Sequence, residues 1–179
     1  MNTVQLKFSQ LRNLIIADIQ ADIAPLLLGR AGIGKSSLLR SLEKDFKTKV
    51  FSIAINQLGE TSDLTGLRPE EHIDPKTNKK RYRMVAFPHA VIDECMEYAE
   101  KHPDETPILF MDEFNRTTPA ITSAILSFTT ERRIGSMHFP SNVRFVLAGN
   151  DTGNINVIDE ASITRFSIYR VAPDTNTFL

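Results

Sequence analysis

Residues 24–36 read APLLLGRAGIGKS, and this stretch decides the fold. An apolar run is followed by the pattern G-x-x-x-x-G-K-[ST], in which a glycine-rich turn joins a buried strand to the start of a helix. The glycines let the backbone curl, so that its N–H groups and the helix N-terminus point at phosphate oxygens. The residues predicted to bind a nucleotide are Gly29, Arg30, Ala31, Gly32, Ile33, Gly34, Lys35, Ser36 and Ser37.

Two side chains of this segment have specific roles at such a site. The ammonium group of Lys35 would contact the β- and γ-phosphates, and the hydroxyl of Ser36 would bind Mg²⁺. The expected ligands are therefore ATP and Mg²⁺, and GTP stays open as an alternative to ATP.

A pair of carboxylates follows a second apolar run, at residues 108–111. Asp112 and Glu113 would lie at the carboxyl edge of a strand, where α/β sheets bind their ligands. Asp112 could hold Mg²⁺ through water, and Glu113 could polarise the water that attacks the γ-phosphate. The pair points to hydrolysis of the nucleotide.

Two more polar residues stand next to apolar runs. Asn150 follows the run 143–148, and its amide could hold the attacking water together with Glu113, although an Asn after a strand is also a common turn residue. Arg165 comes directly before the last run. It would either pair with a carboxylate or reach the γ-phosphate held by a neighbouring subunit.

Apolar runs separated by helical patterns are typical of parallel strands buried on both faces. The runs are 24–28, 50–55, 108–111, 143–148 and 166–171, and they predict one five-stranded α/β sheet with helices on both faces. Helices are expected at 8–19 with Ser9 as a cap, from Gly34 onward, at 87–101 with Cys95 in the core, and at 119–132.

Three segments lie outside this alternation. Residues 1–23 form an N-terminal helical segment, and residues 59–87 form an insertion with a basic run. Residues 133–139 predict a β-hairpin, because Gly135-Ser136 is a two-residue turn of the kind that closes one. The basic run consists of Lys76, Lys79, Lys80, Arg81 and Arg83.

The composition is that of one folded soluble domain of 179 residues, with 41% hydrophobic and 24% charged residues. The net charge of −1 gives no global case for nucleic acid or an anionic membrane as partner. The single cysteine cannot form an internal disulfide, and no signal peptide or membrane span is visible. We expect a cytoplasmic protein.

The segments GRAGIGKSS, ILFMDEFNR, VLAGN and IDEASITRF stand in this order and together resemble AAA+ ATPases. The details look like the MoxR-type group, within the clade that carries an insertion in its second helix. Residues 112–116, DEFNR, resemble that group's DEINR signature. Residues 61–66 resemble a segment that follows its second strand, and residues 74–77 resemble a stretch that leads into the helix before its Walker B strand.

This resemblance implies a P-loop NTPase sheet in the order 5-1-4-3-2, with nucleotide bound between the subunits of a ring, such as a hexamer. It implies Asn150 as sensor 1 and Arg165 as an arginine finger, and it suggests that residues 59–87 and 133–139 face the central pore. Asn56, at the end of the second strand, is a candidate for a switch residue that restrains Glu113.

The expected function is ATP hydrolysis that drives remodelling of an unidentified protein partner, as in a MoxR-like chaperone. AAA+ proteins normally carry a C-terminal helical lid, which this sequence lacks, so residues 1–179 resemble the large α/β subdomain only and weak activity is expected. The alternatives are a P-loop nucleotide kinase, a McrB-like GTP-driven motor on nucleic acid, and a nucleotide-binding switch with little hydrolysis.

Overall fold

The computed structural model describes residues 5–6, 8–30, 32, 34–150 and 166–171. Their main feature is a parallel six-stranded sheet in the order β1-β10-β2-β9-β6-β3. The strands are β1 (Gln5–Leu6), β2 (Ala24–Leu28), β3 (Val50–Ala54), β6 (Ile108–Asp112), β9 (Arg144–Gly149) and β10 (Phe166–Val171). The predicted order 5-1-4-3-2 is confirmed for the last five of these strands. β1 was not predicted and extends the sheet beside β10.

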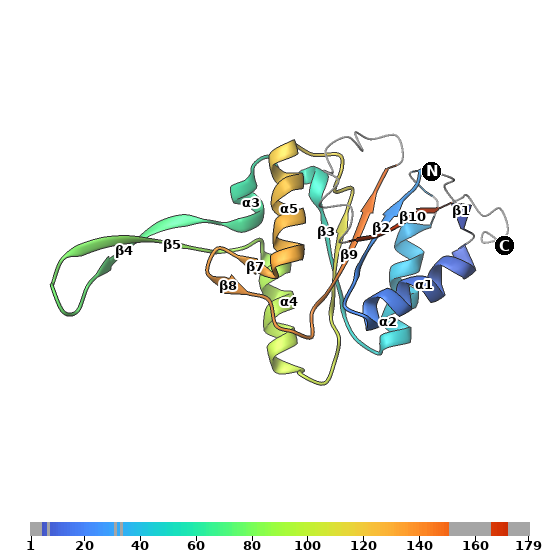
Figure 1. The fold of residues 1–179 in the computed structure, drawn as a ribbon, viewed down its shortest axis with the longest axis horizontal. Coiled ribbons are helices and arrows are strands. Elements are labelled where there is room, and N and C mark those ends of the chain that lie inside the picture. Colours follow the sequence, from blue (N-terminus) through green and yellow to red (C-terminus); the bar gives the residue numbers. More distant parts are fainter. Residues whose placement is uncertain (1–4, 7, 31, 33, 151–165, 172–179) are drawn as a thin grey trace.

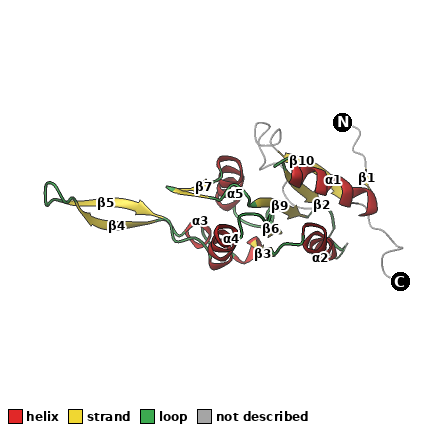
Figure 2. Ribbon diagram, turned by 90° about the horizontal axis from the view of Figure 1, so that it is seen from below, coloured by secondary structure: helices red, strands yellow, loops and turns green. Residues whose placement is uncertain are grey.

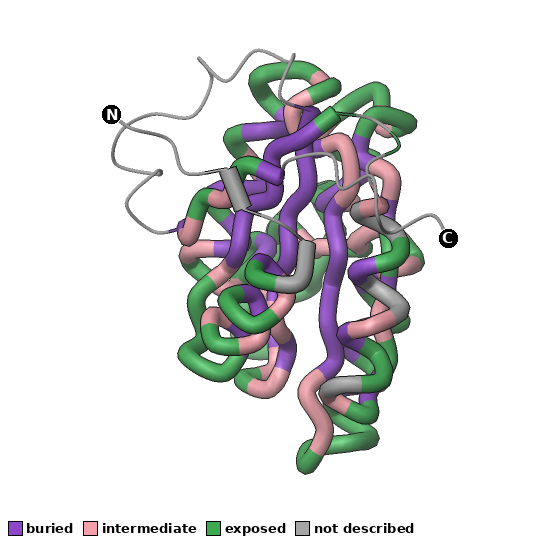
Figure 3. The backbone as a smooth tube through the Cα atoms, turned by 90° about the vertical axis from the view of Figure 1, so that its right-hand side faces the viewer, coloured by how far each residue is buried: buried purple, intermediate pink, exposed green. Residues whose placement is uncertain are grey.

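Helices cover both faces of the sheet, as predicted (Figure 1). α1 (Phe8–Gln20) and α2 (Lys35–Phe46) lie on one face, and α4 (Ala90–Lys101) and α5 (Pro119–Glu131) lie on the other. Neighbouring residues of one strand serve different cores: Leu27 packs with α1 and α2, whereas Leu26 packs with α4 and α5. The central strands β2, β6 and β9 are therefore buried on both sides (Figure 3).

One predicted cap and one predicted helix start are wrong. α1 begins at Phe8, as predicted, but Ser9 lies inside the helix rather than at its cap. α4 begins at Ala90 instead of residue 87, because the ring nitrogen of His89 accepts a hydrogen bond from the N–H of Val91 and caps the helix. Cys95 on α4 is fully buried, as expected.

The insertion at residues 59–87 follows a short 3₁₀ turn, η1 (Ile55–Gln57). It contains a short helix, α3 (Thr61–Thr65), and an antiparallel hairpin of β4 (Arg68–Ile73) and β5 (Lys80–Val85). We call residues 68–85 the arm, since they project away from the sheet in both ribbon views (Figures 1 and 2). The predicted small hairpin is present as β7 (Arg133–Ile134) and β8 (Met137–His138).

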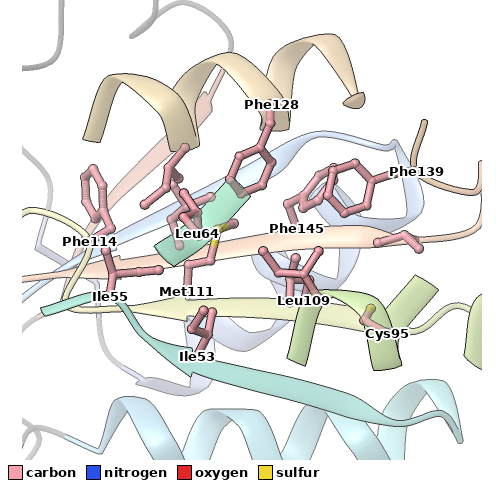
Figure 4. Close-up of a cluster of buried hydrophobic side chains, with 14 of the residues drawn as sticks. Ile53, Ile55, Leu64, Cys95, Leu109, Met111, Phe114, Phe128, Phe139 and Phe145 are labelled. Carbon is pink, nitrogen blue, oxygen red and sulfur yellow. The ribbon is translucent and has the colours of Figure 1, made fainter. Parts of the chain in front are cut away.

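The larger core lies between the sheet and the helices α4 and α5 (Figure 4). Phe139, just after β8, stacks on Phe128 of α5 and meets Phe145 of β9 edge to face, with ring centroids 5.6 and 5.0 Å apart. Leu64 of α3 is fully buried in the same core, which fixes α3, just before the arm, to the sheet. No helix in the described ranges is long and apolar enough to cross a bilayer.

Candidate nucleotide-binding site

The glycine-rich turn lies between the carboxyl end of β2 and the first residue of α2, as the motif requires. Gly32 and Gly34 have φ angles of 82° and 92°, a left-handed region that favours glycine. The N–H of Gly29 donates to the carbonyl of Gly149 (3.2 Å), which joins the turn to β9. Lys35 and Ser36 open α2, so the turn leads into a helix N-terminus that can bind an anion. Ala31 and Ile33 lie outside the described residues.

The first turn of α2 is already closed by backbone hydrogen bonds. The N–H groups of Ser37 and Leu38 both donate to the carbonyl of Gly34, at 2.9 and 3.1 Å. Of the other predicted contact residues, Gly29 is buried, whereas Arg30 and Gly32 are exposed.

The predicted carboxylates lie at the carboxyl end of β6, between the ends of β9 and β3. Asp112 Oδ1 accepts a hydrogen bond from the N–H of Glu113 (2.8 Å) and thereby stabilises a sharp turn. Glu113 has a φ of 54°, an uncommon conformation for a residue with a side chain. Such a conformation costs free energy and persists only where the surrounding structure holds it in place. It is often found at functional residues.

Both carboxylate oxygens of Glu113 are engaged. Oε2 accepts a hydrogen bond from Nδ2 of Asn56 in η1 (2.7 Å), and Oε1 forms an ion pair with Nη1 of Arg116 (3.2 Å). The contact considered between Asn56 and Glu113 is therefore present, while its use as a switch stays a prediction. Arg116 was not predicted to contact Glu113, and the signals in the sequence are its place in the DEFNR segment and its position three residues after Glu113.

Asn150 follows the last residue of β9 and is only 5% exposed. The side chain of Asn115 binds both backbone polar groups of Asn150. Asn115 Oδ1 accepts a hydrogen bond from the N–H of Asn150 (2.9 Å), and Asn115 Nδ2 donates to the carbonyl of Asn150 (2.7 Å). Asn115 was not among the predicted site residues. It stands in the DEFNR segment, but only the fold brings it to a residue 35 positions away.

The structure thus brings Gly29, Asp112, Glu113 and Asn150 to one edge of the sheet, where β2, β6 and β9 end. Arg165 lies outside the described residues.

Magnesium fits the donors that the chain offers here. Mg²⁺ prefers hard oxygen ligands and is usually held by one or two protein groups together with phosphate oxygens and water. Asp112 supplies a half-buried carboxylate at the strand end, and Ser36, at the start of α2, is the residue type that supplies a hydroxyl. Among the described residues, no group of three or more His, Cys, Asp or Glu side chains could bind a metal without such additional ligands.

A cavity of about 250 Å³ lies at the opposite edge of the sheet, where β2, β9 and β10 begin. Its two arginines already have structural partners: Arg132 donates to the carbonyl of Pro140 (2.9 Å), Arg144 donates to that of Ile19 (2.9 Å), and both contact Asp22. Burial lowers the pKa of Arg132. These contacts show that the two arginines of this cavity already serve the fold, so the candidate nucleotide site is the opposite edge of the sheet.

Comparison with known proteins agrees with this geometry. The family model described as AAA domain (dynein-related subfamily) matches residues 25–166. A protein named probable ABC transporter ATP-binding/permease protein, from Haemophilus influenzae, is 29% identical over 148 residues, which are 76% of this chain and 26% of that protein. The crystal structure of a candidate ATPase from Cytophaga hutchinsonii matches 93% of this chain and 47% of its own, with a TM-score of 0.58 and 18% identity. The chain therefore spans about a quarter and about half of these two proteins, and the structural match shows the fold alone.

Proposed function

The chain belongs to the AAA domain family, in its dynein-related subfamily, and on this basis we propose that it binds ATP with Mg²⁺ and hydrolyses the γ-phosphate. The observation that carries the proposal is the position of Glu113, a strained and half-buried carboxylate at the sheet edge where the glycine-rich turn meets β9. A carboxylate placed there suits the activation of water better than the support of a fold.

Binding would use the turn and the first residues of α2. The backbone N–H groups of Gly32 and Gly34 would contact phosphate oxygens, and the cation of Lys35 would contact the β- and γ-phosphates. Ser36 and Asp112 would hold Mg²⁺, which when bound would neutralise charge on the phosphates. The described residues offer no contact that selects adenine over guanine, and ATP is proposed because it is the ligand implied by the resemblance to AAA+ ATPases.

Hydrolysis would use Glu113 as the base that accepts the proton of the attacking water, while the amide of Asn150 holds that water. The contacts with Asn56 and Arg116 hold the carboxylate of Glu113 in one orientation, and we propose that this orientation restrains it from acting as the base. Activity therefore requires these contacts to open. The same contacts favour a second candidate function, a nucleotide-binding switch with little hydrolysis.

We place the chain in a ring, such as a hexamer, of the MoxR type. The support is its resemblance to that group, in which Arg165 would reach the γ-phosphate bound by a neighbouring copy. Mixing Arg165→Ala with Glu113→Gln, each inactive alone, should restore hydrolysis at interfaces that combine an intact Glu113 with an intact Arg165. If the assembled mixture stays as inactive as the two variants, Arg165 does not act between subunits.

The partner we propose is a protein, and the arm is the surface proposed to contact it. Three of the five cations in the basic run form ion pairs across the hairpin. These are Lys80–Glu71 (3.0 Å), Arg81–Asp74 (3.4 Å) and Arg83–Glu70 (3.2 Å). These pairs reduce the charge that the arm offers to phosphate backbones, although residues 68–85 hold six Lys and Arg against three Asp and Glu.

One face of the arm carries exposed apolar and aromatic side chains beside the Lys80–Glu71 ion pair. Residues directly opposite each other in an antiparallel pair share a face, so the pairs Pro69–Met84 and Ile73–Lys80 lie on the same side as Tyr82. Tyr82, Met84 and Ile73 are 71%, 55% and 51% exposed. Clustered exposed apolar side chains mark protein interaction surfaces, so this face supports a polypeptide partner for a MoxR-like remodelling chaperone.

Glu113→Gln is the variant that tests hydrolysis. The amide keeps the size of the side chain but cannot accept a proton, so ATP affinity measured by calorimetry should persist while phosphate release is lost. Glu105→Gln is the matched control. Glu105 accepts a hydrogen bond from Tyr98 (2.6 Å) and lies just before the first residue of β6, far from the site. If Glu113→Gln hydrolyses ATP at the rate of the parent, the catalytic assignment is wrong.

A further inference from the structure

The side chain of Asn115 forms a two-point contact with the backbone of Asn150. Its amide oxygen accepts from the N–H of Asn150 at 2.9 Å, and its amide nitrogen donates to the carbonyl of the same residue at 2.7 Å. Two hydrogen bonds from one planar group to one residue restrict both the distance and the rotation between them. Asn115 therefore fixes the backbone of Asn150 in a way that a single bond could not.

This contact stands where the ladder between β6 and β9 ends. The ladder pairs Met111 with Leu147, and the N–H of Phe114 still donates to the carbonyl of Ala148 (3.1 Å). The chain then turns away after β6, while Asn150 stays buried. Buried backbone N–H and C=O groups need hydrogen-bond partners. The side chain of Asn115 supplies the acceptor and the donor that a longer β6 strand would have supplied to Asn150.

Gly149 shows how closely Asn115 is seated. A Cβ at position 149 would lie 2.7 Å from Oδ1 and 2.9 Å from Cγ of Asn115, and 2.9 Å from a ring carbon of Phe114. Real Cβ contacts are essentially never under 3.0 Å, so position 149 needs glycine while Asn115 is in place. A longer side chain at 115 would have to displace the same backbone.

We infer that Asn115 is a positioning residue for the hydrolysis of ATP, which acts by holding Asn150 where its amide meets the attacking water. This inference rests on the proposed function. Asn115 stands two residues after Glu113 in one turn, so the base and the water-holding amide are set by the same segment. Movement of this turn displaces both groups together.

The test compares Asn115→Ala, Asn150→Ala and the double variant. Since a small misplacement at a reacting centre can cost up to ~10²-fold in rate, Asn115→Ala should lower kcat by about 10- to 100-fold. ATP affinity, measured by calorimetry, should stay within about threefold, because the glycine-rich turn is untouched. If Asn115 acts only through Asn150, the double variant should be no slower than Asn150→Ala alone. Losses in kcat that multiply in the double variant would overturn the inference.

Asn142→Ala is the matched control for loss of a structural amide. Its Nδ2 donates to the carbonyls of Ala99, His102 and Glu105 at 3.0, 3.2 and 3.1 Å, at the opposite edge of the sheet. It should lower the Tm while kcat stays at the parent value. If Asn142→Ala and Asn115→Ala lower kcat equally, the effect is one of stability and the positioning role is wrong.

Two further measurements keep this test independent of the proposed function. Asn115→Asp keeps the acceptor for the N–H of Asn150 but cannot donate to its carbonyl, so its kcat should fall between those of the parent and Asn115→Ala. Hydrogen exchange at the N–H of Asn150 should become faster in Asn115→Ala, and an unchanged rate would refute the contact. If the parent hydrolyses no ATP while this exchange responds as expected, the proposed function fails but the two-point contact stands.

Discussion

Replacing Asn56 by alanine should raise the basal rate of ATP hydrolysis. Asn56 Nδ2 donates to Glu113 Oε2 at 2.7 Å, and this bond restrains the carboxylate proposed to take a proton from water. Alanine removes the donor and leaves the backbone of η1 unchanged. Glu113 then keeps only the ion pair with Arg116 as a restraint.

The size of the effect follows from the strength of that bond. A hydrogen bond to a charged group contributes about 1.5–3 kcal/mol in a buried site, and less in water. Because Asn56 is exposed and Glu113 is half-buried, about 1 kcal/mol is the appropriate figure. This energy shifts the ratio of free to restrained Glu113 by about fivefold, so the basal rate should rise by about that factor.

The assay is phosphate release at saturating ATP and Mg²⁺, together with ATP affinity from calorimetry. Gln57→Ala is the matched control, since Gln57 is the next residue of the same turn and is also exposed. It should leave the rate unchanged. A rate for Asn56→Ala at or below that of the parent, with unchanged affinity, would refute the view that Asn56 restrains the base.

Three further outcomes are expected. Lys35→Ala should abolish ATP binding in calorimetry, because the positive charge of Lys35 offsets the negative charge of the phosphates. Retained affinity would show that the site assignment is wrong. Gly66→Ala should lower the free energy of unfolding by about 2–4 kcal/mol in urea, since φ is 54° and a Cβ would lie 1.7 Å from the carbonyl oxygen of Phe87. Gly59→Ala, whose Cβ would make an ordinary contact at 3.5 Å, should change it little. Tyr82→Ser should change the free energy of unfolding by less than about 0.5 kcal/mol, because its side chain is largely exposed, and a larger loss would show that this face of the arm packs on the body.

The sheet could be predicted because its central strands are buried on both faces. Each apolar run had to be continuous, so the runs at 24–28 and 108–111 were visible without knowledge of their neighbours. β1 was invisible, since two residues are too few for a pattern. The start of α4 was misplaced because Phe87 is apolar for another reason: the guanidinium of Arg68 stacks on its ring at 3.7 Å, at the base of the arm.

The site could be predicted only as far as local motifs reach. The glycine-rich turn and Asp112-Glu113 are each defined by neighbours in the sequence, and the fold places them at one edge. Asn115 was missed because its function depends on Asn150, which the parallel pairing of β6 and β9 brings to it. The ion pairs of the basic run could not be predicted, because only the register of β4 and β5 shows that Arg83 faces Glu70.

The contacts at the sheet edge form one continuous line. It runs from Gly29 to Gly149 by a backbone hydrogen bond, from Asn150 to Asn115 by the two-point contact, and from Glu113 to Asn56 by a side-chain hydrogen bond. A line of contacts does not by itself couple two sites.

Coupling requires a group with two alternative arrangements, and binding at each site must shift the equilibrium between them. Glu113 is the candidate for that group, because its carboxylate either stays with Asn56 or is free to activate water. Asn56 lies in η1, which leads into α3 and then into the arm, so release of Glu113 would also remove a restraint on the segment that carries the arm. The Asn56→Ala variant therefore tests two expectations. Its basal rate of ATP hydrolysis should be higher, and that rate should no longer respond when a protein partner binds the arm.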